Sequence, residues 1–290
     1  MSIKTLLVTT FTLFCVYITH ILCIINGVPI DDLNDAPYQV SIRLKSLDGT
    51  FGSGFVCSGA LIDRQNVLTS AQCLHDSTGK LLSAESFTLV FGTVYRTKAP
   101  SQHISRNIRK IYLHERLNVT KRVYDLAVLR LDEGIPRNYS QIREVSLREN
   151  DVKGNTDCRL AGWGSTVDGG PYSDMLQMVD LKVMGPQNCN NSALVLGRPL
   201  DEDHLCVGAQ KKGACHGDLG APLICEKYNL TGIVTLENGC GAPGRHAVFT
   251  SVFSHKQWIE SVLKMDNSAN LNKTGFVLLV SLLLLLNLLK

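Results

Sequence analysis

The sequence predicts an all-β protein, and two kinds of pattern support this fold class. Residues 38–45 alternate apolar and polar side chains from Tyr38 to Lys45, which is typical of a strand with one face buried. Turn-forming residues recur at short intervals, for example at residues 48–49, 169–171 and 239–244. Many short strands separated by frequent turns favour barrels or a sandwich.

One helix is predicted towards the end of this β-rich region. Ser254 and Gln257 have the spacing of a capping box, in which the two side chains satisfy each other's backbone N–H groups. The apolar residues within 258–263 then fall on one helical face, which indicates a packing surface.

The chain has 290 residues, enough for one large domain or two small ones. Lys4 is followed by an apolar run that ends at Cys23, a small residue at a plausible cleavage point. This pattern predicts a secretory signal peptide over residues 1–23, and a short membrane anchor is the alternative.

The other end of the chain, residues 265–290, contains a polar spacer and an apolar tail. Asn267, Ser268 and Ala269 are small, and residues 276–289 are almost entirely Phe, Val and Leu. The tail is shorter than the roughly 20 residues of a spanning helix. The pattern favours a glycosylphosphatidylinositol (GPI) anchor with Asn267 as the candidate attachment residue. A short transmembrane segment and a simple apolar terminus are the alternatives.

The formal net charge of +3 does not describe the body of the protein. All 26 acidic residues lie between Ile24 and Asp266, where 26 of the 29 basic residues also lie. The other three basic residues are in the end segments (Lys4, Lys273 and Lys290). A neutral body gives no reason to expect nucleic-acid binding. The basic clusters at residues 106–110 and 121–122 are interpreted as solvated surface.

Cysteine usage and sequons place the chain in the secretory pathway. Two of the ten cysteines, Cys15 and Cys23, belong to the predicted leader, which leaves an even number for an oxidising compartment. The Asn-x-Ser/Thr glycosylation sequons fall at Asn118, Asn138, Asn190, Asn229 and Asn272. Together with the leader, they predict a secreted glycoprotein.

Ordered motifs make residues 24–264 resemble the chymotrypsin/trypsin family of serine proteases (peptidase S1). Residues 217–223, Gly-Asp-Leu-Gly-Ala-Pro-Leu, resemble its nucleophile loop Gly-Asp-Ser-Gly-Gly-Pro-Leu. Residues 68–73, Leu-Thr-Ser-Ala-Gln-Cys, are similar to its histidine motif Leu-Thr-Ala-Ala-His-Cys. Further matches are Ile24–Gly27 to the mature N-terminus, Pro37–Ser41 to Pro-Tyr-Gln-Val-Ser, and Asp125–Leu129 to the aspartate motif.

The resemblance implies a specific architecture for this domain. It implies two antiparallel six-stranded β-barrels, divided near residues 135–150, and a C-terminal α-helix. It also pairs all eight cysteines of the body: Cys57–Cys73, Cys158–Cys225, Cys189–Cys206 and Cys215–Cys240.

The same resemblance implies that two of three catalytic groups are replaced. The aspartate position is Asp125, the histidine position is Gln72 and the serine position is Leu219. An amide is no general base near neutral pH, and an isobutyl group has no nucleophilic atom. We therefore expect a pseudoenzyme in which the Gln72 side chain donates an N–H to a buried Asp125. His75 and His216 offer no substitute, and His216 is interpreted as a rim residue.

Other family positions are kept or altered. Asp218 matches the partner of the freed N-terminal amine, with Ile24 as that terminus. Family zymogens carry Arg or Lys before this residue, whereas Cys23 stands here, so we expect signal peptidase to release Ile24. The backbone N–H groups of Gly217 and Leu219 match the oxyanion hole.

The substrate pocket is altered as well. Its base is Gly213, where trypsin has an aspartate, and its wall segment Ser-Trp-Gly reads Thr235, Leu236 and Glu237. Glu237 is expected to crowd an entering peptide. Residues 94–110 contain no acid, so a calcium loop is not expected. No metal and no cofactor are predicted.

The sequence thus predicts a secreted or surface-anchored, inactive serine protease homologue that acts by protein binding or as a regulator of proteolysis. Its partner would be an extracellular protein or a component of a protease cascade, and its tail would contact the membrane. The alternatives are a residual or unorthodox serine-type endopeptidase, and a paralogue with no retained role.

Overall fold

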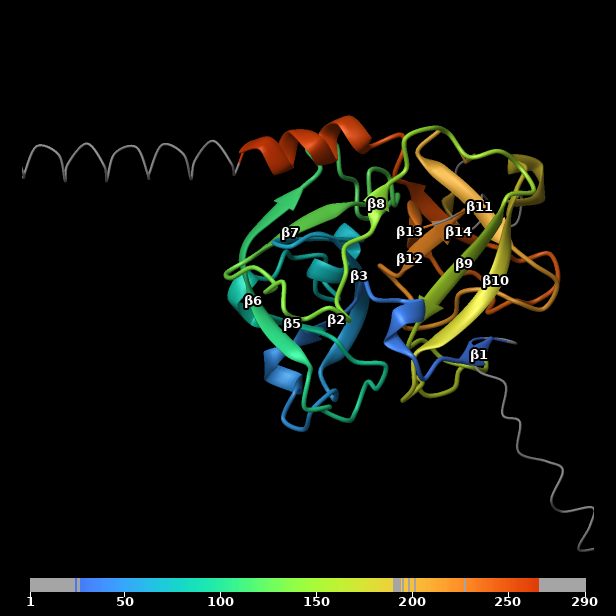
Figure 1. Cartoon of the computed structure of the whole chain (residues 1–290). Coiled ribbons are helices and arrows are strands. Elements are labelled where there is room, and N and C mark those ends of the chain that lie inside the picture. Colours follow the sequence, from blue (N-terminus) through green and yellow to red (C-terminus); the bar gives the residue numbers. More distant parts are fainter. Residues whose placement is uncertain are drawn as a thin grey trace, which may run out of the picture.

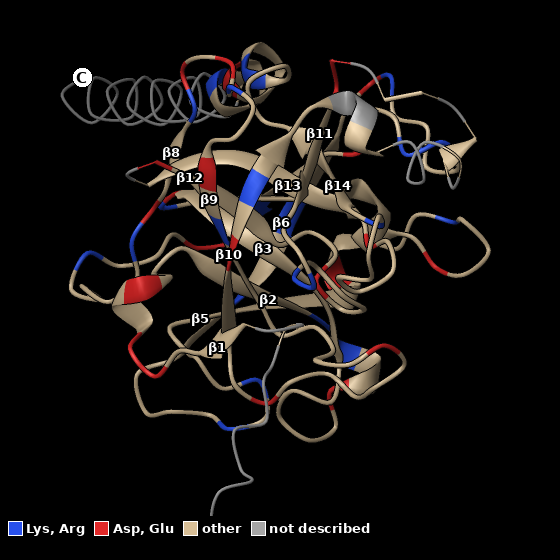
Figure 2. Ribbon diagram, turned by 90° about the vertical axis from the view of Figure 1, so that its right-hand side faces the viewer, with Lys and Arg blue, Asp and Glu red and all other residues tan. Residues whose placement is uncertain are grey.

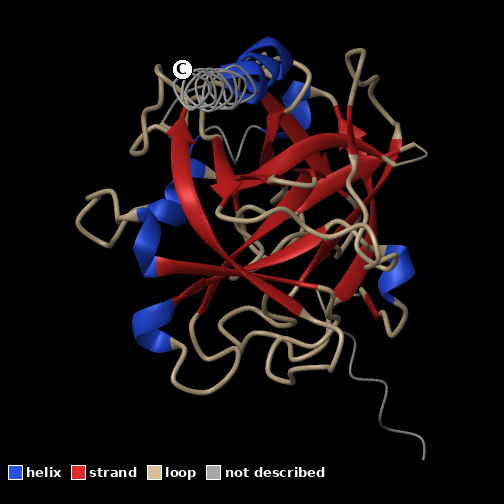
Figure 3. Ribbon diagram, turned by 60° about the vertical axis from the view of Figure 1, so that its left-hand side comes forward, coloured by secondary structure: helices blue, strands red, loops and turns tan. Residues whose placement is uncertain are grey.

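The short β-segments pair into two closed six-stranded antiparallel barrels, as predicted (Figure 1). The computed structural model describes residues 24, 27–189, 194, 196–197, 199–200, 202–226 and 228–265. Strands dominate this part of the chain, and the helical segments are short (Figure 3).

The first barrel closes in the order β2-β3-β4-β7-β6-β5. Its core cluster includes Val40, Ile42, Leu89 and Leu129, all fully buried. The 3-10 turn η1 (Leu33–Asp35) precedes its first strand, and the turns η2 (Lys45–Leu47), η3 (Ala71–Leu74) and η4 (Ala84–Ser86) lie between its strands. Its strands are β2 (Gln39–Leu44), β3 (Phe55–Asp63), β4 (Asn66–Thr69), β5 (Phe87–Phe91), β6 (Ile104–Leu113) and β7 (Ala127–Leu131).

The second barrel closes because β9 and β10 pair with each other at the two ends of the path β10-β11-β14-β13-β12-β9. β1 (Val28–Pro29) extends this sheet beside β10, and β8 (Ser146–Leu147) pairs in parallel with β13. The 3-10 turn η5 spans Pro186–Cys189. The barrel strands are β9 (Asp157–Gly162), β10 (Gln177–Met184), β11 (His204–Gly208), β12 (Pro222–Cys225), β13 (Asn229–Leu236) and β14 (Ala247–Ser251).

Strand β2 shows how the alternating pattern is used. Val40 and Ile42 face the barrel core, but the polar residues between them are buried too, so the strand is not half-exposed as predicted. Arg43 is fully buried and lies 4.0 Å from the centre of the Phe51 ring and 3.6 Å from an Asp48 oxygen. An ion pair and a ring contact compensate the desolvation that burial of a guanidinium costs.

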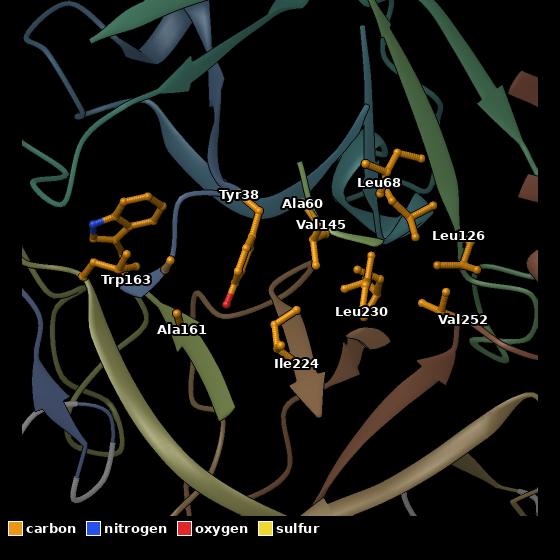
Figure 4. Close-up of a cluster of buried hydrophobic side chains, with 14 of the residues drawn as sticks. Tyr38, Ala60, Leu68, Leu126, Val145, Ala161, Trp163, Ile224, Leu230 and Val252 are labelled. Atoms are coloured by element: carbon orange, nitrogen blue, oxygen red, sulfur yellow. The ribbon is translucent and has the colours of Figure 1, made fainter. Parts of the chain in front are cut away.

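A third cluster of apolar side chains holds the two barrels together (Figure 4). The first barrel contributes Ala60 and Leu68, and the second contributes Ala161 and Ile224. Trp163 is fully buried in this cluster and donates its indole N–H to the Val94 carbonyl at 3.0 Å. The chain crosses between barrels over residues 132–156, a segment that includes the expected division near 135–150.

The predicted C-terminal helix is present over residues 256–265 of the described chain and lies above β6 and β7 in Figure 1. Its buried face includes Ile259 and Val262. The capping-box prediction is wrong. The Ser254 hydroxyl donates to the Glu202 carbonyl at 2.5 Å, and Ile259 N–H bonds to the His255 carbonyl.

The four predicted cysteine pairs are all joined: Cys57–Cys73, Cys158–Cys225, Cys189–Cys206 and Cys215–Cys240. Basic and acidic residues are interspersed over the ribbon, in line with a neutral body (Figure 2). Within the described residues, no helix has the length and apolar character needed to cross a membrane. The predicted leader at 1–23, Asn267 and the apolar tail lie outside the described residues.

Candidate functional site

A buried carboxylate lies where the two barrels meet. Asp125 directly precedes Leu126 and β7 and has no exposed surface. Its side chain accepts hydrogen bonds from the Ser70 hydroxyl at 2.6 Å, from the Gln72 backbone N–H at 2.9 Å, and from the Thr235 hydroxyl. Ser70 and Gln72 belong to the first barrel and Thr235 to the second, so this carboxylate joins both.

The Gln72 contact differs from the prediction in one respect. The donor to Asp125 is the backbone N–H of Gln72, not its side-chain amide. The reason is local, because Ser70 is the N-cap of η3 and its side chain accepts from Gln72 N–H, which turns that N–H towards the carboxylate. The sequence analysis missed Ser70, which stands where the family motif has alanine.

Leu219 occupies the loop position where the resemblance expects a serine hydroxyl. Its side chain is half-buried and packs against the core cluster of the first barrel. Its carbonyl accepts from Ser58 N–H at 3.0 Å. The next residue, Gly220, has φ +78°, and a Cβ there would lie 2.3 Å from the Ser58 carbonyl oxygen. This close approach explains why a glycine is needed and fixes the loop against β3.

Asp218 is fully buried and accepts from the backbone N–H groups of Gly164 and Cys215, each at 2.9 Å. Burial raises the pKa of Asp218 to about 7. Ile24 is also fully buried, in the core cluster of the second barrel. The predicted pairing of Asp218 with a freed Ile24 amine stays a prediction, because it concerns the chain after cleavage.

The altered pocket positions belong to two segments of the second barrel, at Gly213 and at residues 235–237. Gly213 is buried, and a Cβ on it would have Gly241 N at 3.5 Å. Thr235 and Leu236 end β13 and are buried, and Glu237 follows them. The Thr235 carbonyl accepts from the Arg122 guanidinium. Arg122 is therefore half-buried in this site, and the interpretation of its cluster as solvated surface is wrong for this residue.

The Glu237 carboxyl group is turned into the protein. Burial, followed by the charge of Asp218, raises the pKa of Glu237 to about 8. The backbone N–H groups of Leu219 and Asp218 and the Arg122 charge act in the opposite direction. His216 Nδ1 lies 3.8 Å from a Glu237 oxygen, and His216 Nε2 lies 3.2 Å from Asp168 Oδ1.

The His216 neighbourhood could suggest metal binding. Ligand atoms of Asp168, His216 and Cys240 lie within 4.8 Å of one another. The Cys240 sulfur, however, is bonded to Cys215, so it is not a thiolate ligand. The His216 side chain is exposed. The other histidine considered, His75, follows η3, and its Nδ1 lies 2.8 Å from the Ala71 carbonyl oxygen.

The sequons differ in accessibility. Asn118 and Asn138 are exposed, whereas Asn229 is half-buried at the start of β13. Asn190 and Asn272 lie outside the described residues.

Two six-stranded barrels that bury an aspartate at their junction define the trypsin-like class of double-barrel protein. The family description "Trypsin" matches residues 24–259, and the chain therefore belongs to the trypsin family. It is 31% identical to "Trypsin epsilon" of Drosophila erecta over 77% of this chain and 81% of that protein. It is 29% identical to "Trypsin zeta" of the same species, over 82% and 85%. It is 27% identical to "Hypodermin-B" of Hypoderma lineatum, over 79% and 83%.

Replacing Ser70 by alanine tests how the Asp125 carboxylate is held. Ser70→Ala removes one of its hydrogen-bond donors while the carboxylate stays buried, so we expect the free energy of unfolding to fall by about 1–3 kcal/mol. Chemical denaturation followed by tryptophan fluorescence measures this change. Ser105→Ala, at an exposed position in β6, is the control. Equal effects of the two substitutions would contradict the assigned role.

Glu237→Gln tests the pKa of the turned-in carboxyl group. Because its pKa is raised from 4.5 to about 8 on folding, the folded state binds more protons than the unfolded state between these values. Stability then falls as pH rises through this window. We expect wild type to lose about 2–4 kcal/mol relative to Glu237→Gln between pH 5 and pH 8.

Unfolding curves at several pH values measure this loss, with Glu202→Gln, at an exposed position, as the control. A parallel pH dependence in wild type and Glu237→Gln would refute the assignment.

Proposed function

We propose that the chain is a non-catalytic member of the trypsin family that acts by binding a protein outside the cell. The observation that carries the proposal is Leu219 at the place of the nucleophile. A leucine side chain cannot attack a carbonyl, and Gln72, at the family's histidine position, cannot take up and return a proton near neutral pH. Loss of both groups costs about a millionfold in rate.

The surrounding protein supports a retained binding role. The four disulfides are kept, and each contributes about 2–4 kcal/mol to stability. Asp125 keeps three donors even though the family histidine is replaced, with Ser70 supplying one of them. A chain that was not under selection for folding would not be expected to keep hydrogen-bond donors around the Asp125 carboxylate. The proposed partner is an extracellular protein or a protease of a cascade, and regulation of proteolysis is the corresponding role.

The alternative function is that of a residual serine-type endopeptidase. Its support is the naming of the relatives as trypsins, together with the retained Asp125. The two functions differ in whether an activated hydroxyl exists in the folded protein.

A fluorophosphonate probe separates these two functions. Protein purified from cells that express the full chain should show no covalent labelling that depends on the fold, because Leu219 offers no hydroxyl for phosphorus to bond. Gel fluorescence and intact mass measure the labelling, with active trypsin as the positive control. Labelling that disappears on heat denaturation would instead support the endopeptidase.

The proposal places the mature protein on the cell surface, held by a GPI anchor near Asn267. Phosphatidylinositol-specific phospholipase C should then release the protein from intact cells. Retention on the membrane after phospholipase treatment would exclude the lipid anchor and support a transmembrane tail.

The first residue of the mature protein is a separate prediction. Edman sequencing should give Ile24, and a different first residue would exclude signal-peptidase release of Ile24.

A further inference from the structure

An unpaired strand edge adjoins the Asp218–Leu219 loop. Among the described strands, β13 pairs with β12 only as far as Ile233, and the backbone bonds of Val234 to Gly220 and Ala221 continue this pairing by one residue. Past this point, the carbonyl of Thr235 lies on the edge of β13 and has no partner strand among the described residues. A free strand edge of this kind is where an extended peptide can add by main-chain hydrogen bonds. We call the surface formed by this edge and the Gly217–Leu219 backbone the cleft.

The Thr235 carbonyl is already bonded to the chain's own Arg122. The guanidinium reaches it from a loop 113 residues earlier in the sequence. Arg122 has φ +52°, an uncommon backbone conformation for a residue with a side chain. The favourable charges around the guanidinium are Asp125 and Glu237. Because the Thr235 carbonyl is bonded to Arg122, it is not free to accept a backbone hydrogen bond from an added peptide strand.

The amide side of the cleft is taken by Glu237. Its side chain is only 15% exposed, and its carboxyl group faces the backbone N–H of Leu219, whereas the Asp218 N–H donates to the Cys215 carbonyl at 3.0 Å. A backbone N–H group at such a place can bind an anion or a carbonyl oxygen. The carboxyl group of Glu237 occupies this place, where a bound peptide would put a carbonyl oxygen.

A third side chain covers Gly217. Gly217 has φ +96°, and a Cβ on it would come within 2.7 Å of the Tyr172 ring. The ring of Tyr172 is held edge-on to Phe55, with 5.7 Å between ring centres. Burial, followed by the charge of Glu237, raises the pKa of the Tyr172 hydroxyl, in line with the two side chains lying in one region.

We infer that Arg122, Glu237 and Tyr172 form a built-in plug that closes the cleft to extended peptides. The three side chains come from different segments, and each covers a different part of the cleft: the carbonyl of Thr235, the amide of Leu219 and the face of Gly217. The plug is independent of the lost nucleophile, because it blocks binding and not chemistry. A partner of the folded protein is therefore bound on another surface, and the cleft accepts a peptide only when the plug is removed.

Peptide binding by a plug-deficient protein tests this inference. The variant R122A/E237A is prepared from cells that express the full chain, beside wild type. The probe is a disulfide-cyclised inhibitor-loop peptide with leucine at the residue that enters the pocket, because the pocket base is Gly213. Calorimetry should give an affinity at least about tenfold higher for the variant than for wild type. The control R137A/E85A also removes one arginine and one glutamate, but at exposed positions.

Two results would overturn the inference. One is wild-type protein that binds the peptide as tightly as R122A/E237A does. The other is a folded R122A/E237A protein that binds no better than wild type or the R137A/E85A control.

The single variant E237G, which restores the family's glycine, provides a second readout by amide hydrogen exchange if the double variant does not fold. We expect faster exchange at the Leu219 N–H in E237G than in wild type, and equal exchange overturns the plug. Because none of these measurements depends on catalysis, their outcome is separate from that of the labelling experiment.

Discussion

The buried carboxylate of Asp125 is the interaction on which the arrangement of the two barrels depends. An ionised carboxylate away from water is costly unless donors surround it. Here the donors come from both barrels, from the turn after β4 and from the end of β13. The barrels cannot shift relative to each other without breaking one of these bonds. The apolar cluster between the barrels stabilises their contact by burying apolar surface. The hydrogen bonds of the Asp125 carboxylate fix the geometry of that contact.

Much of the fold could be predicted from the sequence because its signals are local and ordered. Alternation marks β2, and the resemblance to the trypsin family implies the double barrel and the cysteine pairs, which the structure confirms. The site was harder to predict. The sequence shows which residue types replace histidine and serine, but not that Gln72 uses its backbone N–H or that Ser70 supplies a new donor.

Arg122 shows why the other contacts of the site could not be predicted from the sequence. In the sequence it is one member of a basic pair, and such pairs are ordinarily solvated. Its partner carbonyl lies far along the chain, at a strand end whose position is set only when both barrels have closed. Sequence periodicity carries no information about such a contact. The capping box failed for a related reason, because the Ser254 hydroxyl found a tertiary acceptor in the Glu202 carbonyl.

Leu219 also has a consequence for how the chain can change in evolution. Its side chain is part of the apolar packing of the first barrel, so a return to serine would remove buried methyl groups and leave space at that surface. The same step would restore a hydroxyl to a chain that has an amide, Gln72, at the family's histidine position, so no general base at that position would activate it. Leucine at this position is therefore constrained by packing as well as by chemistry, and a change to serine carries a structural cost.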